Sequence, residues 1–497
     1  MKILILGAGQ VGSSVAEGLV SEENDITLVD TDAEQLHYLQ DRFDLRTVCG
    51  NASLPSVLRQ AGIEDTDLLI AVTQSDQVNL VTCKIAQSIF KVPTRIARLR
   101  SPEFLSDEIL LSEDNFAVNF VICPEQIITD YILRLVDFPE ALQVLDFARG
   151  RISMVAVRAY EGGLLVGHPI SDMDTHFSSA YLTSRANIAL PIGMNQPHSA
   201  HIEARIAAIF RQNQSVAPTG HTILQPGDEV FLLAASEHIR TVLRELRRDQ
   251  VPSRRIMIAG GGNIGQRVAS ALEKDHEIKI VEGNPKRAEA LAESLSDALV
   301  LCGTATDTDL LEQENIAETD LFLALTNDDE DNIMAATLAK RLGCKRVAAL
   351  VNRRAYAEVL EGGPIDISIS PSQISIGPLL ARVRQGDVSR VHPLRRGAAE
   401  ALEIVVHGDS KTSRIVGRRI NEIDWPPGVT VGALVRNFSQ ADVGHIEGNA
   451  KHVAHSGQVI IKHDAMIQEN DHVVIFCTEK RLVKEVIKLF QVGFGFF

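Results

Sequence analysis

The chain has 497 residues, which is enough for three or four domains of about 100 to 200 residues each. Its hydrophobic content of 45% and charged content of 23% are ordinary for folded proteins and give no bias toward disorder. With 49 Lys plus Arg against 65 Asp plus Glu, the formal net charge is −16, which repels a phosphate backbone and argues against nucleic-acid binding. No apolar run approaches the roughly 20 residues that cross a bilayer, and the N-terminus reads as a strand rather than a signal segment, so we expect a cytosolic protein.

The first predicted elements are a buried strand at 2–6, a glycine-rich loop and a helix. The loop residues are Gly7, Ala8, Gly9, Gln10, Val11 and Gly12. Gly7 permits the sharp turn, Gly9 lets the backbone approach a phosphate, and Gly12 lets the helix pack closely on the sheet, while the helix N-terminus supplies free N–H donors. Asp30 ends the next apolar run, where its carboxylate would accept hydrogen bonds from both ribose hydroxyls and repel a 2′-phosphate. This pattern predicts binding of NAD(H) or ADP/ATP rather than NADP(H).

Further candidate contacts follow the third and fourth predicted strands. Asn51 and Ala52 come after the third strand, and Thr73 and Gln74 come after the fourth. An open parallel sheet presents its ligand crevice at the carboxyl ends of its strands. We therefore expect these four residues to contact adenine and ribose.

The fifth predicted strand, 94–100, carries two arginines near its carboxyl end. Strand alternation places Arg98 and Arg100 on one face, at the end that meets the ligand. Arginine holds phosphate oxygens in a bidentate fork, so this site would respond to phosphate number and charge. The alternative is that both are surface arginines flanking a strand.

The same pattern recurs 253 residues later. Matching segments include 50–52 with 303–305 and 67–73 with 320–326, and Asn79 matches Asn332. Register held over more than 70 residues indicates a tandem repeat of large units. We interpret 1–125 and 254–372 as two copies of one nucleotide-binding domain. The candidate residues of the second copy are Gly260, Gly261, Gly262, Asn263, Ile264, Gly265, Glu282, Thr304, Thr326 and Asn327.

The second copy departs from the first in ways that affect its ligand. Thr304 stands where the first copy has an asparagine, and no alignment places arginines at both positions of the fifth strand. We therefore expect the second site to depend mainly on backbone N–H groups and the helix dipole. The acidic run 327–332 lies at a predicted helix N-terminus, which favours negative charge, and a cation site is the alternative.

Two smaller units with strand, turn and strand texture follow the nucleotide-type units, at 141–238 and 393–490. Proline and polar residues indicate linkers at 249–253 and at His392-Pro393. The predicted fold class is α/β, with two Rossmann-like doubly wound parallel-sheet domains alternating with two small α+β domains.

Signals for catalysis and for metal binding are missing from the sequence. Its six cysteines form no Cys-x-x-Cys pair and no zinc spacing with histidine. Cys49 and Cys302 occupy equivalent positions, where we expect small buried thiols at strand ends, with redox sensing as the alternative. The sequence contains no Gly-x-Ser-x-Gly elbow, no Walker A loop and no His with an adjoining acidic partner that stands out as a proton donor. We therefore predict no enzyme activity and no metal site.

The order and duplication of these motifs resemble the Trk potassium-uptake regulatory family, in which two RCK (KTN) nucleotide-binding units are each followed by an RCK C-terminal unit. The resemblance covers nearly the whole chain and depends on 7–12 with Asp30, 50–52, 71–74, 97–100 and their second-copy equivalents. It implies a homo-oligomer, a dimer or tetramer forming a ring, under a membrane potassium-transporting subunit of the Trk type. It also implies a cytoplasmic location, peripheral on the inner membrane, and binding of NAD(H) or ATP/ADP that transmits the nucleotide state to the pore.

Two other function classes stay open from the sequence. An NAD-dependent oxidoreductase would need a substrate pocket facing the nicotinamide, and a nucleotide-sensing scaffold would bind the same ligands without a channel. The aromatic tail at 491–497 is either a frayed terminus or a docking segment.

Overall fold

The computed structural model divides the chain into two compact units. The first comprises Met1–Leu133 and Ser253–Val383, and the second comprises Arg134–Pro252 and most of the chain after Val383. Each unit therefore collects one kind of domain from both halves of the sequence. The structure describes residues 1–492 except 21, 23, 106, 174–201, 213, 244–245, 247–252, 354, 357–359, 361–362, 385–386, 395–397, 437–456 and 463.

The first half of the first unit is a six-stranded parallel sheet with the order β3-β2-β1-β4-β5-β6. Its strands are β1 Lys2–Leu6, β2 Asp25–Asp30, β3 Arg46–Cys49, β4 Leu68–Ala71, β5 Thr94–Arg98 and β6 Phe120–Ile122. Its helices are α1 Gln10–Val20, α2 Ala33–Arg42, α3 Pro55–Gln60, α4 Asp76–Ser88, α5 Pro102–Leu105, α6 Glu108–Leu111 and α7 Pro124–Asp137, with the 3-10 turn η1 Ile63–Asp65. The strand order reverses between β1 and β4, which is the topological switch point where such sheets bind ligands.

The second half of the first unit repeats this sheet in the order β14-β13-β12-β15-β16-β17. Its strands are β12 Arg255–Ala259, β13 Glu277–Glu282, β14 Leu299–Cys302, β15 Leu321–Ala324, β16 Arg346–Leu350 and β17 Ile367–Ile369. Its helices are α10 Asn263–Leu272, α11 Pro285–Ser294, α12 Thr308–Gln313, α13 Asp329–Arg341 and α15 Pro371–Val383, with η4 Ile316–Glu318.

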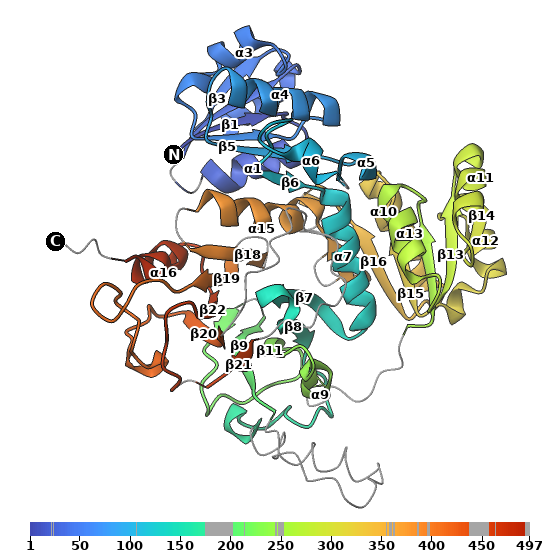
Figure 1. Ribbon diagram of the computed structural model, residues 1–497. Helices are drawn as coiled ribbons and strands as arrows, with labels where there is room; N and C mark the ends of the chain where they lie inside the picture. Colours follow the sequence, from blue (N-terminus) through green and yellow to red (C-terminus); the bar gives the residue numbers. More distant parts are fainter. Residues whose placement is uncertain are drawn as a thin grey trace, which may run out of the picture. The chain divides into compact units, whose positions relative to one another are not determined.

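Each parallel sheet is covered by helices on both faces, which explains why its strands are continuous apolar runs. In the first sheet, Leu4 and Leu6 pack with Leu58 of α3 and Leu80 of α4, and α1 lies on the opposite face (Figure 1). In the second sheet, Met257 and other buried strand residues pack with α12 and α13 in the same way. Burial on both faces fixes the strand ends, and the strand ends position the loops of the candidate sites.

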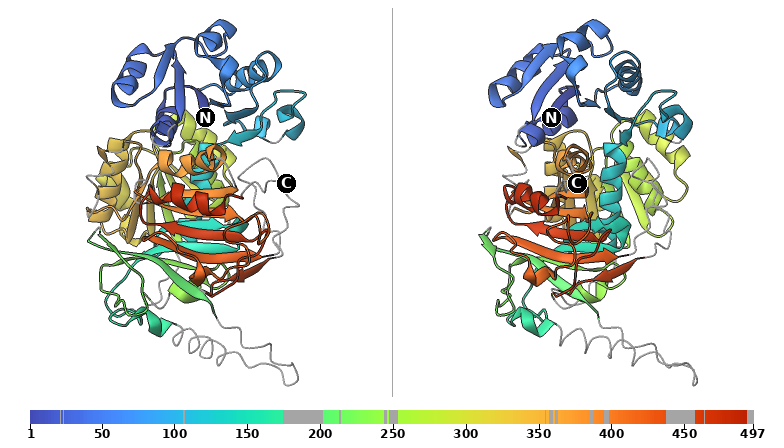
Figure 2. Two further views of the ribbon diagram at one scale, coloured as in Figure 1. Left: turned by 90° about the vertical axis from the view of Figure 1, so that its left-hand side faces the viewer. Right: turned by 60° about the vertical axis from the view of Figure 1, so that its left-hand side comes forward.

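The second unit contains two five-stranded antiparallel sheets, with the orders β10-β9-β11-β8-β7 and β18-β19-β22-β20-β21. The strands are β7 Ala141–Phe147, β8 Ile152–Arg158, β9 Ala204–Arg211, β10 Gln214–Val216, β11 Glu229–Ala235, β18 Val388–Leu394, β19 Ala399–Val405, β20 Val429–Arg436, β21 Gln458–Ile460 and β22 His472–Cys477. The helical elements are η2 Ala148–Gly150, η3 Ile170–Asp172, α9 Ile239–Leu243, η6 Ile420–Glu422 and α16 Leu482–Phe490. The two sheets lie against each other (Figure 2) and share one core, in which the rings of Phe231 and Phe476 are 5.5 Å apart.

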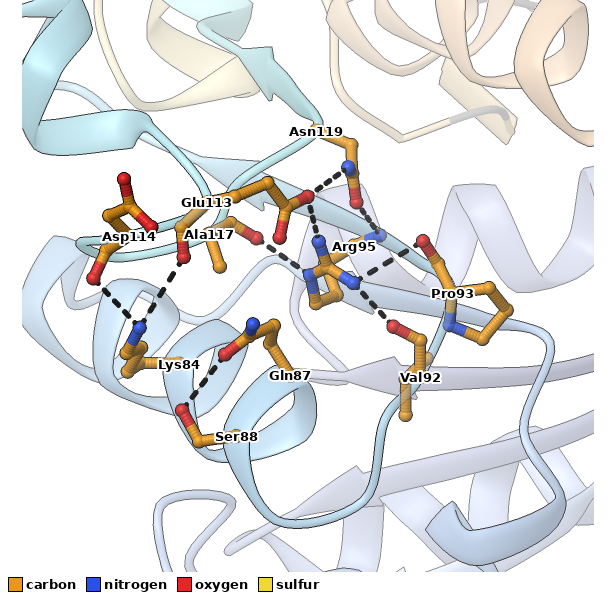
Figure 3. Close-up of polar contacts among 10 residues, drawn as sticks. All are labelled: Lys84, Gln87, Ser88, Val92, Pro93, Arg95, Glu113, Asp114, Ala117 and Asn119. Carbon is orange, nitrogen blue, oxygen red and sulfur yellow. Dashed lines mark hydrogen bonds and ion pairs between the residues drawn. The ribbon is translucent and has the colours of Figure 1, made fainter.

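A buried arginine on β5, Arg95, holds the segment that leads into β6, the last strand of the first parallel sheet (Figure 3). Arg95 is only 3% exposed, and its guanidinium donates to the carbonyl oxygens of Val92, Pro93 and Ala117 and to the Glu113 carboxylate. Asn119 completes the cluster, because its Oδ1 accepts from the Arg95 backbone N–H at 2.8 Å and its Nδ2 donates to Glu113 at 2.9 Å. Arg95 therefore has a structural role at the amino end of β5, away from the ligand end.

Three expectations from the sequence change or cannot be followed in the structure. His392 and Pro393 do not form a linker, because both lie inside β18 and pair with β19; β18 is an edge strand, where proline is tolerated. Cys49 and Cys302 are exposed rather than buried, because β3 and β14 are also edge strands. Most of the linker at 249–253 and of the tail at 491–497 lies outside the described residues.

Candidate functional site

The first glycine loop has the backbone geometry that its sequence predicts. Gly7 has φ +106°, in the left-handed region that favours glycine. A Cβ on Gly12 would lie 1.8 Å from the Gly7 carbonyl oxygen, so Gly12 is required by the loop's own backbone, and any effect on helix packing comes second. Gly260 and Gly265 repeat both features, with φ +100° and a distance of 2.0 Å. Each loop is therefore a preformed turn.

The middle glycine of each loop is open. A Cβ built on Gly9 or on Gly262 meets no atom within 4 Å. Each glycine precedes a helix whose first residue, Gln10 or Asn263, is exposed and whose second, Val11 or Ile264, is partly buried. The absence of a Cβ leaves backbone N–H groups of the helix N-terminus accessible to an anion.

The acidic residue that ends each second strand is bonded to the loop. Asp30 accepts hydrogen bonds from the backbone N–H groups of Ala8 and, at 3.0 Å, Asp32. Glu282 accepts from Gly261 at 2.9 Å and from Asn284 at 2.8 Å. Each carboxylate thus holds its own loop while keeping lone pairs for a ligand, because a carboxylate offers about four acceptor positions.

The second loop opens into a pocket of about 280 Å³. Six residues singled out in the sequence line this pocket: Gly260, Gly262, Glu282, Thr304, Thr326 and Asn327. Gly261, Asn263, Ile264 and Gly265 are not among the residues that line it. The remaining lining residues are Val281, Gly283, Arg287, Gly303, Ala305, Thr306, Leu325, Asp331 and Ala335. The pocket therefore joins the carboxyl ends of β12, β13, β14 and β15.

The threonine after the fourth strand is held by a buried asparagine in both sheets. Asn79 Oδ1 accepts from the backbone N–H of Thr73 at 3.0 Å and from its hydroxyl at 2.7 Å, while Asn79 Nδ2 donates to the carbonyls of Thr73 and Arg98. Asn332 makes the same four bonds to Thr326 and Leu350. Both asparagines are fully buried.

The other candidate residues after β3 and β4 differ in their exposure and in their hydrogen bonds. Gln74 is exposed, Ala52 is buried, and Asn51 Oδ1 accepts from the Ser53 N–H and hydroxyl at 2.9 and 2.8 Å. The asparagine clamp on Thr73 therefore fixes the loop after β4, but it occupies the threonine hydroxyl that we expected to meet a ribose.

The two arginines of the first sheet meet a carboxylate. Arg98 Nη2 lies 2.9 Å and Arg100 Nε lies 3.7 Å from the Oε1 of Glu125, near the start of α7. Within the described part of the chain, neither side chain hydrogen-bonds to the 7–12 loop. Arg267 of α10 donates to Gln126 at 2.5 Å and to the Arg100 carbonyl at 3.2 Å. The arginine pair therefore lies between the two halves of the first unit.

The acidic run at 327–332 is explained by helix capping and loop bonding. Asp328 caps α13 by accepting from the Asp331 N–H at 2.9 Å. Asp329 is buried and accepts from the backbone N–H groups of Asn352 and Arg353. Among the described residues, no group of three or more His, Cys, Asp or Glu side chains could hold a metal ion.

Thiol chemistry also differs between buried and exposed cysteines. Burial raises the pKa of Cys83 to about 12 and that of Cys477 to about 12, so both stay protonated and unreactive at neutral pH. Cys49 donates to the Thr31 carbonyl at 3.7 Å near the end of β3.

A search of the described residues for a helix that is both long and apolar enough to cross a membrane finds none.

Sequence reasoning missed Arg287, a charged residue in the second pocket. It lies on α11, five residues after Glu282, and its Nε donates to the Gly261 carbonyl at 2.7 Å. The expectation that the second site depends mainly on backbone N–H groups and the helix dipole therefore left out a charged side chain. The signal was present in the sequence, because an arginine in the first turn of the helix after the acidic residue has no counterpart in the first copy.

Comparisons with protein families match both kinds of domain. The TrkA-N domain family matches residues 3–124 and 256–371, and the TrkA-C domain family matches residues 196–247. The chain is 47% identical over 498 residues to the Trk system potassium uptake protein TrkA of Halomonas elongata, with 100% of both chains covered. It is 45% identical over 492 residues to the protein of the same name from Haemophilus influenzae, with 99% of both covered.

Solved structures with the same fold include the GsuK RCK domain and the GsuK channel, both of low sequence identity. The crystal structure of the GsuK RCK domain superimposes with a TM-score of 0.57 at 16% identity, covering 98% of this chain and 94% of that chain. The GsuK channel bound to NAD gives a TM-score of 0.57 at 16% identity, covering 98% of this chain and 78% of that chain. These likenesses confirm the predicted fold class, in which Rossmann-like parallel sheets alternate with small antiparallel units.

Proposed function

The chain belongs to the TrkA family of Trk system potassium uptake proteins, and on that premise we propose that it is the nucleotide-binding regulatory subunit of such a system. It binds NAD(H) or ATP/ADP, catalyses no reaction, and couples nucleotide binding to gating of a membrane potassium-transporting subunit. It works as a homo-oligomeric ring, a dimer or tetramer, on the cytoplasmic face of the inner membrane.

The observation that carries the proposal is the pocket at the second glycine loop. An open helix N-terminus at Gly262, an acidic residue at the end of β13, and small polar residues after β14 and β15 surround one space of about 280 Å³. These are the positions at which a doubly wound sheet holds pyrophosphate, ribose and adenine. The GsuK channel, which has the same fold, has been solved bound to NAD. Together these features support adenosine nucleotides as the ligand class.

Regulation requires that a nucleotide bind two arrangements of the protein with different affinities, because a ligand with equal affinity for both shifts no equilibrium. Arg98 and Arg100 are suited to such a difference. Their guanidinium groups meet Glu125 on α7, and Arg267 links the same place to α10, the helix that starts at the second glycine loop. A phosphate that competed with Glu125 for these arginines would change the contact between the two halves of the first unit.

Calorimetric titration of the full-length protein with NAD⁺, NADH, ADP, ATP and NADP⁺ tests the binding step. Gly9→Asp and Gly262→Asp introduce a carboxylate where a Cβ meets no atom, so each blocks one anion site without a steric clash. Aspartate is also favoured at a helix N-cap, which keeps the fold intact. We expect each variant to lose one class of sites, with affinity there reduced about tenfold or more, and the double variant to lose both. Unchanged isotherms in the double variant would refute the assignment of both loops.

Potassium flux through the Trk membrane subunit in vesicles tests the coupling step. We expect flux to depend on both the full-length protein and the nucleotide, and Gly9→Asp with Gly262→Asp to remove the nucleotide dependence. Consumption of NADH during the titrations would instead indicate an oxidoreductase. Nucleotide binding with no effect on flux and no association with the membrane subunit would indicate a sensing scaffold.

A further inference from the structure

Arg287 is the only basic residue among those that line the second pocket. It is the third residue of α11, and Asn284 caps this helix by accepting from the Arg287 backbone N–H at 3.2 Å. Its Nε donates to the Gly261 carbonyl at 2.7 Å, which fixes the guanidinium plane against the glycine loop. Among the described residues, no group accepts a hydrogen bond from its two terminal amino groups. Arg287 therefore brings free donors to the pocket in a fixed orientation.

Glu282 and Arg287 both hydrogen-bond to the backbone of Gly261, the first as an acceptor and the second as a donor. Glu282 Oε2 accepts from the Gly261 N–H, and Arg287 Nε donates to the Gly261 carbonyl. A Cβ on Gly261 would lie 2.1 Å from Leu291 Cδ1 and 3.1 Å from Glu282 Oε2, so the loop packs closely on α11 and on the carboxylate. An acceptor-only carboxylate and a donor-only guanidinium, each bonded to the backbone of Gly261, thus both border the pocket.

This pair matches the chemistry of a ribose diol. Each ribose hydroxyl donates one hydrogen bond and accepts others, so adjacent hydroxyls can donate to a carboxylate and accept from a guanidinium at once. Neither a phosphate, which only accepts, nor an apolar group would satisfy both side chains. The position also fits, because the carboxylate at the end of the second strand lies where such sheets meet the adenosine ribose.

The first sheet lacks this arrangement. The third residue of α2 is Gln35, whose Nε2 lies 3.5 Å from the Ser13 hydroxyl, and the residue before it is Glu34. Asp30 therefore has no guanidinium from α2 beside it. The third residue of this helix is therefore one of the positions at which the two copies differ.

We propose that Arg287 acts with Glu282 to recognise the 2′,3′-diol of the adenosine ribose in the second pocket, and that it determines the preference of this pocket for unmodified ribonucleotides. The proposal rests on the proposed function, because it assumes that the pocket takes an adenosine nucleotide. It adds a charged side-chain donor to the contacts that this pocket offers to the ribose.

The test uses the full-length protein with Gly9→Asp, in which the first loop is blocked, and measures binding of ADP, 2′-deoxy-ADP, 3′-deoxy-ADP and 2′,5′-ADP by calorimetry. We expect ADP to bind about tenfold more tightly than at least one deoxy analogue, as for a hydrogen bond to a charged group. Arg287→Ala should weaken ADP about tenfold and remove that preference. Arg287→Lys, which keeps the charge but loses the planar fork, should restore binding only in part.

The matched control is Gln35→Ala in the Gly262→Asp background, which should leave the ADP preference of the first site unchanged. Equal weakening of ADP and both deoxy analogues by Arg287→Ala would show a merely structural role and overturn the proposal. If 2′,5′-ADP bound more tightly than ADP, and Arg287→Ala removed that preference, Arg287 would bind a phosphate. That result would also overturn the proposal. ADP binding in the Gly262→Asp protein but not in the Gly9→Asp protein would leave the proposed function standing and refute this inference. Binding in neither would refute both.

Discussion

The two parallel sheets of the first unit have the same frame and different charges. Both have the same strand order, the same glycine geometry and the same buried asparagine after the fourth strand. The first sheet has its arginines at and just after the end of β5, paired with Glu125, whereas the second has Arg287 on the helix after β13. The comparison indicates that the frame is set by backbone requirements, which both copies keep, and that ligand preference is set by a few side chains, which differ.

The antiparallel sheets of the second unit also share a frame and differ in single side chains. The last residue of β9, Arg211, makes a bidentate pair with buried Asp228, and the last residue of β20, Arg436, does so with buried Asp471, at 2.8 to 2.9 Å. By contrast, the fifth residue of β7 is leucine while the fifth residue of β18 is His392. Substitutions that make one copy resemble the other test this comparison, as does removal of a feature that both copies share.

The largest effect is expected for Arg95→Val, which gives the first sheet the residue that β16 carries at Val347. The variant removes the guanidinium that donates to the carbonyl groups of Val92, Pro93 and Ala117 (Figure 3), while Glu113 keeps its bond from Asn119. We expect a loss of about 3 to 5 kcal/mol in the free energy of unfolding, because each buried carbonyl that loses its donor costs about 1 to 3 kcal/mol. Urea unfolding measures this, with exposed Arg59→Ala as the control. A loss below about 1 kcal/mol would show that the first sheet does not need the anchor.

The second prediction concerns a feature that both copies share. Asn79→Ala and Asn332→Ala each leave a threonine N–H and a strand carbonyl without the partner that the buried asparagine supplied, and each should cost about 3 kcal/mol. Thermal unfolding should show similar losses for both, while exposed Gln77→Ala should show almost none. A large loss for only one asparagine would mean that the clamp supports only one of the two sheets.

The third prediction is a pH dependence in the second unit. Burial, with Arg390 and Arg134 nearby, lowers the pKa of His392 to about 4, despite the carbonyl of Asp146 that contacts its Nε2 at 3.0 Å. Since the unfolded state then binds more protons between pH 4 and 6.5, this contribution to stability is complete above pH 6.5 and is lost as the pH falls toward 4.

His392→Leu, which copies Leu145 of β7, should therefore remove about 2 kcal/mol of the stability lost between pH 7 and pH 5. Urea unfolding at both pH values measures the difference, with exposed His221→Gln as the control. An identical pH dependence in the wild-type and His392→Leu proteins would contradict the assignment.

The repeat and the fold class could be predicted from the sequence because they depend on local rules. Glycines that need a left-handed φ, or that lie too close to a backbone oxygen for a Cβ, recur at fixed spacing, and strands buried on both faces read as apolar runs. The edge strands were predicted less well. His392 and Pro393 were interpreted as a linker because proline interrupts most strands, but an edge strand has a side that needs no donor.

The charged contacts of the site could not be predicted from spacing alone. Arg98 meets Glu125, which is 27 residues away, and the pairing depends on how α7 packs after β6. Alternation placed Arg98 and Arg100 on one face correctly, because both reach the same carboxylate, but it could not identify that carboxylate. Arg287 was missed because it lies on the helix that follows the acidic residue, outside the loops and strand ends that define the repeat.

The smallest effect is expected for Gln35→Arg, which introduces into the first sheet the charge that the second sheet already has. The change costs little, because Gln35 makes only a 3.5 Å contact to Ser13. In the Gly262→Asp background, the new guanidinium should lie beside Asp30 and improve ADP affinity about threefold, equivalent to under 1 kcal/mol, without improving the affinity for 3′-deoxy-ADP. Calorimetry with both ligands measures this, and Gln35→Lys is the control for charge alone. Equal gains for both ligands would mean that the arginine attracts phosphate charge at a distance, so that the difference between the two copies lies in their electrostatic potential and not in ribose recognition.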